Sequence, residues 1–244
     1  MRRRQFLQGV SAGLLAGTAA VHSKAAFADH GQLNVEVEKY RKAAVERWED
    51  DIKMLEERDK SEQHPDDSIL FVGSSSIRRW DNIATNMLPY HAIQRGYGGA
   101  KWSDVAIFAE RLISPHNFRA AVFFVGNDIS GGENDKTPSE VVGLFAHVLK
   151  TLRKHNATAP VFYIAVTPTA RRFEAWPKIK AANSAIGKFC RTKDNTYFLG
   201  TENIYLDGDG KPRNEFFVED KLHLNQAGYD LWAAAIKSHL DSSL

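Results

Sequence analysis

Cysteine is almost absent from this 244-residue sequence, in which Cys190 is the only one. A single cysteine has no partner for a disulfide within the chain. Cys190 ends the segment Ile186-Gly187-Lys188-Phe189-Cys190, which has a helical pattern and contains no histidine. We therefore interpret Cys190 as a buried structural thiol and not as a nucleophile.

Long apolar runs are also scarce. The small and apolar run from Gly9 to Val21 is shorter than the roughly 20 residues that cross a membrane. It follows three arginines at positions 2–4 and precedes Ala26-Phe27-Ala28, a small-x-small cleavage site. Residues 1–28 are therefore predicted to be a signal peptide, with 29–244 as a single mature domain and no stable membrane insertion. The paired arginines before Gln5-Phe6-Leu7 favour the twin-arginine route over an ordinary Sec signal, and either route places the protein in the bacterial periplasm or outside the cell.

Charge of one sign is not in excess once this segment is set aside. The whole chain has a net charge of +2, and residues 1–28 carry four basic residues and no acidic one, so residues 29–244 have a net charge of −2. Nothing in this balance argues for a nucleic-acid partner. No cluster of histidine, cysteine and acidic residues suggests a metal site, and we expect no cofactor.

The chain is organised around residues 68–80, Ser-Ile-Leu-Phe-Val-Gly-Ser-Ser-Ser-Ile-Arg-Arg-Trp. The apolar run from Ile69 to Gly73 is too short for a helix and rich in β-formers, which predicts a buried strand of a parallel sheet. The serines that follow then lie on a strand-to-helix turn, at the edge where open α/β sheets bind ligands. Taken alone, Gly-Ser-Ser-Ser also fits a polar turn with an N-cap. A phosphate-binding nest is the weaker alternative, because the Lys-Ser or Lys-Thr of a P-loop is missing.

Strand and helix patterns alternate along the rest of the chain. Strands are predicted over 69–73, 91–95, 120–126, 161–166 and 197–200, and helices over 35–60, 102–112, 138–155, 177–192 and 226–240. This alternation predicts one α/β domain, in which right-handed crossovers cover both faces of a parallel sheet.

Polar residues occur at four comparable places in this pattern. Ser75 follows the first strand, Gly98-Gly99 the second and Gly126-Asn127-Asp128 the third, while Asp220 and His223 precede the last helix. In a parallel sheet these places lie at one edge. Together they supply a nucleophile, a backbone donor, a side-chain amide donor and an Asp–His pair, which are the groups that acyl transfer requires.

These segments resemble the sequence blocks of the SGNH hydrolases, also called the GDSL esterase/lipase family. The blocks are Phe71-Val72-Gly73-Ser74-Ser75-Ser76-Ile77, Arg95-Gly96-Tyr97-Gly98-Gly99, Gly126-Asn127-Asp128, and Asp220-Lys221-Leu222-His223-Leu224-Asn225 followed by Gly228-Tyr229. The similarity covers nearly all of residues 35–240. It implies a three-layer α/β/α sandwich like that of flavodoxin, built around a five-stranded parallel sheet.

The resemblance also implies a role for each polar group. Ser75 is the nucleophile, His223 is its base, and Asp220 orients the histidine. The oxyanion hole consists of the backbone N–H groups of Ser75 and Gly99 and the side-chain amide of Asn127. Histidine suits the role of base because the ordinary pKa of an imidazole lies near 6.5, so that it can accept a proton near neutral pH.

One residue departs from the pattern that gives the family its name. Ser74 occupies the place of the aspartate in Gly-Asp-Ser, as it does in one branch of the family, so any help that the aspartate gives to the turn must come from elsewhere. On the sequence alone, Ser74 and Ser76 are rival nucleophiles, and alignment on Gly73 selects Ser75.

The predicted function is that of an exported serine esterase that removes short acyl groups, above all acetyl groups, from a small-molecule or carbohydrate ester. Two alternatives stay open. One is an acyltransferase that passes the acyl group to an envelope glycan, and the other is a non-catalytic carbohydrate- or lipid-binding protein that uses the same cleft.

Several other residues lie close to the predicted site. We expect Asp128 to structure its loop and not to act in catalysis. Arg171 and Arg172 follow the fourth strand and are expected to be solvated, with contact to the substrate as the alternative. Four aromatic residues flank the motif loops and are expected mainly to pack, with one or two lining the site: Trp80, Tyr97, Trp102 and Trp176.

Overall fold

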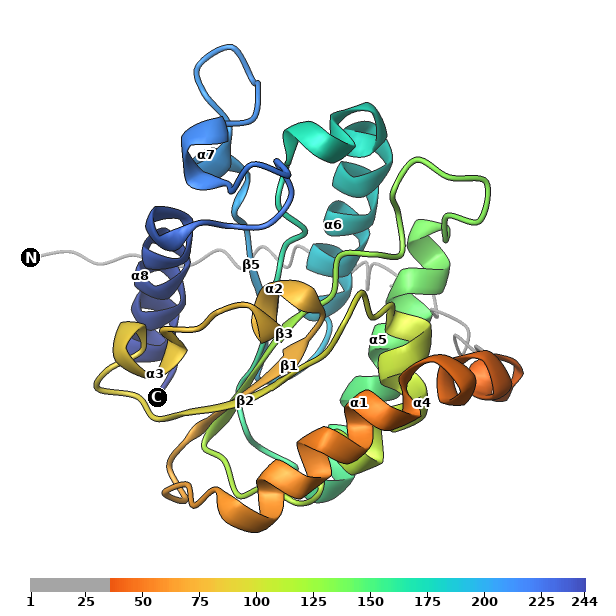
Figure 1. Cartoon of the computed structure of the whole chain (residues 1–244), viewed down its shortest axis with the longest axis vertical. Helices are drawn as coiled ribbons and strands as arrows, with labels where there is room; N and C mark the ends of the chain where they lie inside the picture. The colour runs from red at the N-terminus through yellow and green to blue at the C-terminus, as the bar shows by residue number, and fades with distance from the viewer. Residues whose placement is uncertain (1–35) are drawn as a thin grey trace, which may run out of the picture. The chain divides into compact units, whose positions relative to one another are not determined.

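The computed structural model describes residues 36–244, so the predicted signal peptide, residues 1–28, lies outside the described residues. Five strands form one sheet of order β2-β1-β3-β4-β5, and every neighbouring pair is parallel (Figure 1). The strands are β1 (Ile69–Gly73), β2 (Ala92–Gly96), β3 (Ala120–Phe124), β4 (Val161–Ile164) and β5 (Thr196–Leu199). The predicted parallel sheet is confirmed, and all strand ends lie within two residues of their predicted positions.

Helices cover both faces of this sheet (Figure 1). Along β1, Leu70 and Val72 face one helical layer, whereas Ile69 and Phe71 face the other. The first layer contains α1 (Arg41–Ser61), α4 (Trp102–Ile113), α5 (Pro138–His155) and α6 (Trp176–Cys190), and the second contains α3 (Ile83–Asn86) and α8 (Gln226–Ser243). The arrangement is the predicted three-layer α/β/α sandwich. Within residues 36–244, no helix has the length and apolar character needed to cross a membrane.

Shorter helical segments connect these elements. They are η1 (Val37–Tyr40), α2 (Ser75–Arg78), η2 (Ala170–Ala175), α7 (Glu202–Tyr205) and η3 (Asn214–Phe216). The sequence patterns predicted a loop where η2 lies, and a single helix where η1 and α1 follow one another. Short 3₁₀ turns have too few residues to show an apolar period, which explains why the sequence did not reveal them.

Helix α5 was predicted residue for residue, because its signals are local. Thr137 precedes it, and the Thr137 Oγ1 accepts the N–H of Glu140 at 3.2 Å. In return the Glu140 carboxylate accepts the N–H of Thr137 at 2.8 Å. This capping box, followed by Pro138 in the first turn, fixes where the helix begins.

Cys190 is buried at the end of α6, with 1% of its surface exposed. Burial raises the pKa of its thiol to about 12. The thiolate is therefore not populated near neutral pH, and the interpretation of Cys190 as a structural residue is confirmed.

Candidate active site

The turn that carries Ser75 is fixed by close contact between the ends of β1 and β3. A side chain at Gly73 would collide with the carbonyl oxygen of Phe124. The N–H of Ser74 donates to that same oxygen at 3.0 Å, and the carbonyl of Ser74 accepts the N–H of Ile77 at 3.0 Å. Because the Ser74 side chain makes no cap hydrogen bond, the backbone holds the turn without the family's aspartate.

Ser75, His223 and Asp220 form a continuous hydrogen-bonded relay. The His223 Nε2 lies 2.9 Å from the Ser75 Oγ, and the His223 Nδ1 lies 2.6 Å from the Asp220 Oδ2. When Nδ1 carries the ring proton and donates it to Asp220, Nε2 is free to accept the proton of the serine hydroxyl. The structure therefore brings together the three predicted residues, which are up to 148 positions apart in the sequence.

The loop before α8 holds the aspartate and the histidine in place. An antiparallel bridge joins Phe217 to Leu224, and the N–H of Val218 donates to the carbonyl of His223 at 2.9 Å. Within the loop, the Asp220 Oδ1 accepts the N–H groups of Leu222 and His223, each at 2.9 Å.

These contacts also determine the charge of Asp220. Partial burial alone would raise the pKa of its carboxyl. The hydrogen bonds from the His223 ring and from the two backbone N–H groups outweigh burial and lower the pKa to about 2. Asp220 is therefore ionised throughout the neutral range, as a group that stabilises an imidazolium must be.

The predicted oxyanion donors also lie next to one another. The Asn127 Nδ2 donates one hydrogen to the carbonyl of Ala100 at 3.0 Å, which leaves its second hydrogen available. A Cβ at Gly99 would lie 4.0 Å from this Nδ2. The N–H of Ser75 is in the first turn of α2, where helix N–H groups have no partner within the helix. Within residues 36–244, no protein group accepts the N–H of Ser75 or of Gly99.

Comparison with protein families gives one match, the GDSL-like Lipase/Acylhydrolase family, over residues 67–231. The chain belongs to this family. It is accordingly a serine hydrolase that acts on ester bonds, and the expectation drawn from its sequence blocks is confirmed. Comparison with the curated proteins finds no match.

Several solved structures share the fold of this chain at low identity. A protein from Streptococcus pneumonia matches with a TM-score of 0.72 and 16% identity, over 84% of this chain and 97% of that one. A GDSL-like lipase from Bacteroides thetaiotaomicron matches with a TM-score of 0.67 and 20% identity, over 79% of this chain and 98% of that one. An acetyl xylan esterase matches with a TM-score of 0.56 and 21% identity, over 70% of this chain and 98% of that one.

In this GDSL-like hydrolase, Asp128 joins the two loops that carry the predicted oxyanion donors. Both of its carboxyl oxygens accept the N–H of Trp102, the first residue of α4, at 3.1 and 2.9 Å. Its neighbour Asn127 is bonded to Ala100, so two successive residues fasten the loop after β3 to the chain that follows Gly99. The prediction that Asp128 structures its loop agrees with this geometry. Burial raises the pKa of Asp128 to about 7, although the Trp102 hydrogen bond opposes that shift.

Replacing Asp128 by asparagine should make the hydrolase more stable relative to wild type as the pH rises. An exposed aspartate in the unfolded chain titrates near pH 4, whereas the buried carboxyl has a pKa of about 7. Asp128 thus stabilises the folded state fully below about pH 4 and loses that contribution as the pH rises to 7. The asparagine can still accept the Trp102 N–H and does not titrate. Urea unfolding measures the free energy of unfolding of both proteins at pH 4 and pH 8. The difference, variant minus wild type, should be greater at pH 8 than at pH 4 by a few kcal/mol.

The comparison of the two proteins removes the contributions that they share. The largest shared contribution comes from His116. Burial lowers the pKa of its imidazole to about 4, so this residue stabilises the folded state at higher pH in both wild type and variant. A difference that stays constant between pH 4 and pH 8 would contradict the raised pKa of Asp128.

The loop that contains Gly99 packs closely against α1. Gly98 has a φ of +27°, and a side chain at this position would overlap the indole of Trp48. Trp48 also packs edge-on against Tyr97, with ring centroids 5.5 Å apart, and its Nε1 donates to the Asp104 carboxylate at 3.2 Å. The path of the backbone through this loop therefore depends on a helix that precedes the family match.

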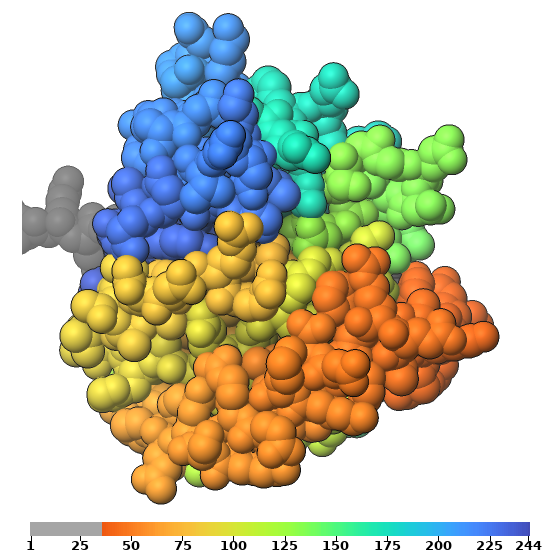
Figure 2. Space-filling model, viewed as in Figure 1, coloured from red at the N-terminus to blue at the C-terminus, as the bar shows by residue number. Residues whose placement is uncertain are grey.

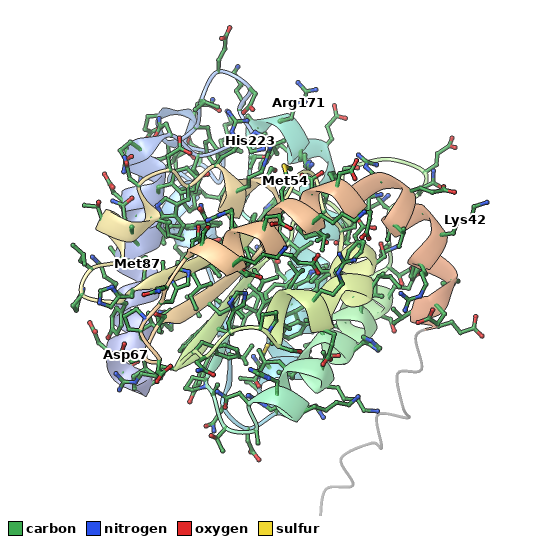
Figure 3. All side chains as sticks on the ribbon, turned by 60° about the horizontal axis from the view of Figure 1, so that its bottom comes forward. Lys42, Met54, Asp67, Met87, Arg171 and His223 are labelled. Atoms are coloured by element: carbon green, nitrogen blue, oxygen red, sulfur yellow. The ribbon has the colours of Figure 1, made fainter. Side chains whose placement is uncertain are left out.

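A small cavity opens beside the Ser75–His223 pair, with an accessible volume of about 30 Å³. Figure 2 shows the face on which three segments meet: the gold segment with α2, the blue C-terminal segment and the green segment after β3. Figure 3 shows His223 and Arg171 at one end of the molecule and Asp67, which precedes β1, toward the other. The apolar part of the cavity wall consists of Phe124, Val166, Phe217, Leu222, Leu224 and Trp232.

Sequence reasoning missed most of this wall. The four aromatic residues that flank the motif loops are all buried in the core, and none of them lines the cavity. Trp232 lines it instead, from α8. Its position in the sequence, within a regular helical pattern, does not distinguish it from other core residues.

Two arginines near the site were also misjudged or overlooked. Arg172 was expected to be solvated, and this prediction is wrong. Its side chain is partly buried and donates hydrogen bonds to two residues of the loop after β3. Arg79, which the sequence did not single out, is exposed, and its NH1 lies 3.1 Å from the His223 Nδ1 and 3.7 Å from the Asp220 Oδ2. An exposed ion pair of this kind contributes little to stability.

Proposed function

We propose that this hydrolase removes short acyl groups, above all acetyl groups, from carbohydrate esters, through an acyl-enzyme on Ser75. The observation that carries the proposal is the Ser75–His223–Asp220 relay, with distances of 2.9 and 2.6 Å. A serine hydroxyl is a poor nucleophile until a base accepts its proton, and His223 is placed to do so.

In the first half of the reaction, the Ser75 Oγ attacks the ester carbonyl carbon while the His223 Nε2 takes the hydroxyl proton. The carbonyl oxygen becomes negatively charged and accepts hydrogen bonds from the N–H groups of Ser75 and Gly99 and from the Asn127 Nδ2. As the tetrahedral intermediate collapses, the bond to the leaving alcohol breaks, and His223 donates its proton to that alcohol.

In the second half, water replaces the alcohol. His223 takes a proton from the water, whose oxygen attacks the acyl carbon. The bond to the Ser75 Oγ then breaks, and the proton returns from His223 to the serine. Asp220 stabilises the imidazolium in both halves, because its carboxylate remains ionised.

The size of the cavity supports a short acyl group. An accessible volume of about 30 Å³ holds a group of a few heavy atoms, and a long hydrocarbon chain would have to lie outside it. One of the similar folds is that of an acetyl xylan esterase, which supports an acetylated carbohydrate as the substrate. The predicted signal, residues 1–28, supports export to the periplasm or beyond.

The purified protein should hydrolyse p-nitrophenyl acetate fastest, and p-nitrophenyl octanoate at least about tenfold more slowly in kcat/KM. The p-nitrophenyl butyrate ester should fall between them, since the leaving group is the same and only the acyl chain grows. Equal or faster hydrolysis of the octanoate would exclude the short-acyl proposal. Acetylated xylan tests the carbohydrate part, which fails if the protein cleaves p-nitrophenyl acetate but releases no acetate from the polysaccharide.

A further inference from the structure

Arg172 lies in η2, the 3₁₀ segment between β4 and α6. Its NH1 donates to the carbonyl of Gly126 at 2.6 Å, and its NH2 donates to the Asn127 Oδ1 at 2.7 Å. The next residue back, Arg171, is exposed, and its backbone N–H donates to the carbonyl of Lys221 at 3.2 Å. One short segment therefore contacts the loop of the oxyanion donor and the loop of His223.

We propose that Arg172 is the positioning residue that fixes which way the Asn127 amide faces during catalysis. This inference rests on the proposed function, in which the Asn127 Nδ2 donates to the oxyanion. A carboxamide has an oxygen and a nitrogen of similar size, and only the nitrogen can donate. A site that relies on this donor therefore needs contacts that prevent the amide from flipping by about 180°.

The contacts of Asn127 supply that means at both ends of the amide. A guanidinium has donors and no acceptor, so Arg172 can bind the amide oxygen and not the amide nitrogen. At the other end, the carbonyl of Ala100 is an acceptor and can bind only the nitrogen, at 3.0 Å. A flipped amide would lose both hydrogen bonds, with N–H facing N–H at one end and oxygen facing oxygen at the other.

The guanidinium is suited to this role in a way that an ammonium is not. Its planar fork reaches two acceptors on successive residues, Gly126 and Asn127, with its two terminal nitrogens. The fork thus ties the amide to the backbone of its own loop. Within residues 36–244, no carboxylate lies within ion-pairing distance of Arg172, so the neutral oxygens of this loop are its partners.

The test measures kcat and KM for p-nitrophenyl acetate in Arg172→Ala, with Arg171→Ala as the matched control. Removal of the fork should lower kcat about 10- to 100-fold and leave KM within about threefold, a smaller loss than removal of the oxyanion donor itself. Arg171→Ala should stay within about twofold of wild type, because only its backbone is engaged. Arg172→Lys should recover little of the loss, since one ammonium cannot hold both oxygens.

A double-mutant cycle with Asn127→Ala separates orientation from other roles. If Arg172 acts through Asn127, Arg172→Ala should cost less than about threefold once the amide is absent. Multiplicative losses in the double mutant would overturn the proposal, and so would full rescue by lysine, which would make charge the relevant property. An increase in KM at constant kcat would also overturn it, by assigning Arg172 to substrate binding.

A measurement that needs no turnover keeps this inference distinct from the proposed function. The NMR order parameter of the Asn127 side-chain NH₂, assigned by comparison with Asn127→Asp, should fall in Arg172→Lys and remain unchanged in Arg171→Ala. The lysine variant serves here because it keeps the charge and most of the volume, and its melting temperature checks that it is folded. An unchanged order parameter would overturn the positioning role alone, whereas a wild-type protein without esterase activity would overturn the proposed function alone.

Discussion

Replacing Ser75 by alanine is expected to lower kcat for p-nitrophenyl acetate by at least about 10⁴-fold. The hydroxyl is the only group of this side chain that can form the acyl-enzyme, and its Oγ is the atom that faces the His223 Nε2, 2.9 Å away. Residual turnover in the variant would come from binding and from the oxyanion donors, which alanine leaves in place because one of them is the backbone N–H of residue 75. Steady-state kinetics on wild type and variant, with matched melting temperatures, measure the loss.

The two neighbouring serines provide matched controls for this experiment. Ser74 is buried and Ser76 is half-buried, and neither hydroxyl bonds to His223 among the described residues. Ser74→Ala and Ser76→Ala should therefore keep kcat within about tenfold of wild type. A loss confined to one of these variants, with Ser75→Ala still active, would reassign the nucleophile.

Asp220→Asn should reduce kcat by about 10⁴-fold without a large change in melting temperature. The Asp220 Oδ1 accepts two backbone N–H groups at 2.9 Å, so an asparagine will place its oxygen there and its NH₂ where Oδ2 now faces the His223 Nδ1. The NH₂ donates, which forces Nδ1 to accept and moves the ring proton to Nε2. An Nε2 that carries a proton cannot take one from Ser75.

Glu219→Gln provides the control for the charge that Asp220→Asn removes. Glu219 is an exposed acid next to Asp220 in the same loop, so its loss changes the net charge equally but leaves the relay intact. Its kcat should stay within about twofold of wild type. If Asp220→Asn retained more than about a tenth of wild-type kcat, the orienting role of Asp220 would be wrong.

Much of the relay was predictable because its signals are local or periodic. Ile69 to Gly73 forms a strand and Ser75 follows it for reasons contained in a few residues, namely a short apolar run and a glycine at a close contact. Asp220 and His223 are three residues apart, so one turn can join them. Parallel strands end at one edge of the sheet, and this rule of topology brings together groups that are far apart in the chain.

Arg172 shows what such reasoning cannot reach. Two adjacent arginines in a polar segment are ordinarily solvated, and Arg171 is. The partners of Arg172 lie 45 and 46 residues away, and only the packing of η2 against the loop after β3 gives this one arginine its acceptors. The same holds for Trp232, whose indole forms part of the cavity wall only because α8 lies against the end of β3.

The contact between Trp48 and Gly98 has a consequence for where this enzyme's functional unit begins. The family match starts at residue 67, yet the indole that shapes the Gly99 loop belongs to α1, residues 41–61. A protein truncated at the start of the family match would keep every candidate catalytic residue. It would lose Trp48, against which the loop with Gly99 packs. For protein engineering, α1 therefore supports the predicted active site through Trp48, although it carries none of the candidate catalytic residues. Fusions, truncations or stabilising substitutions in that helix should be judged by turnover as well as by expression.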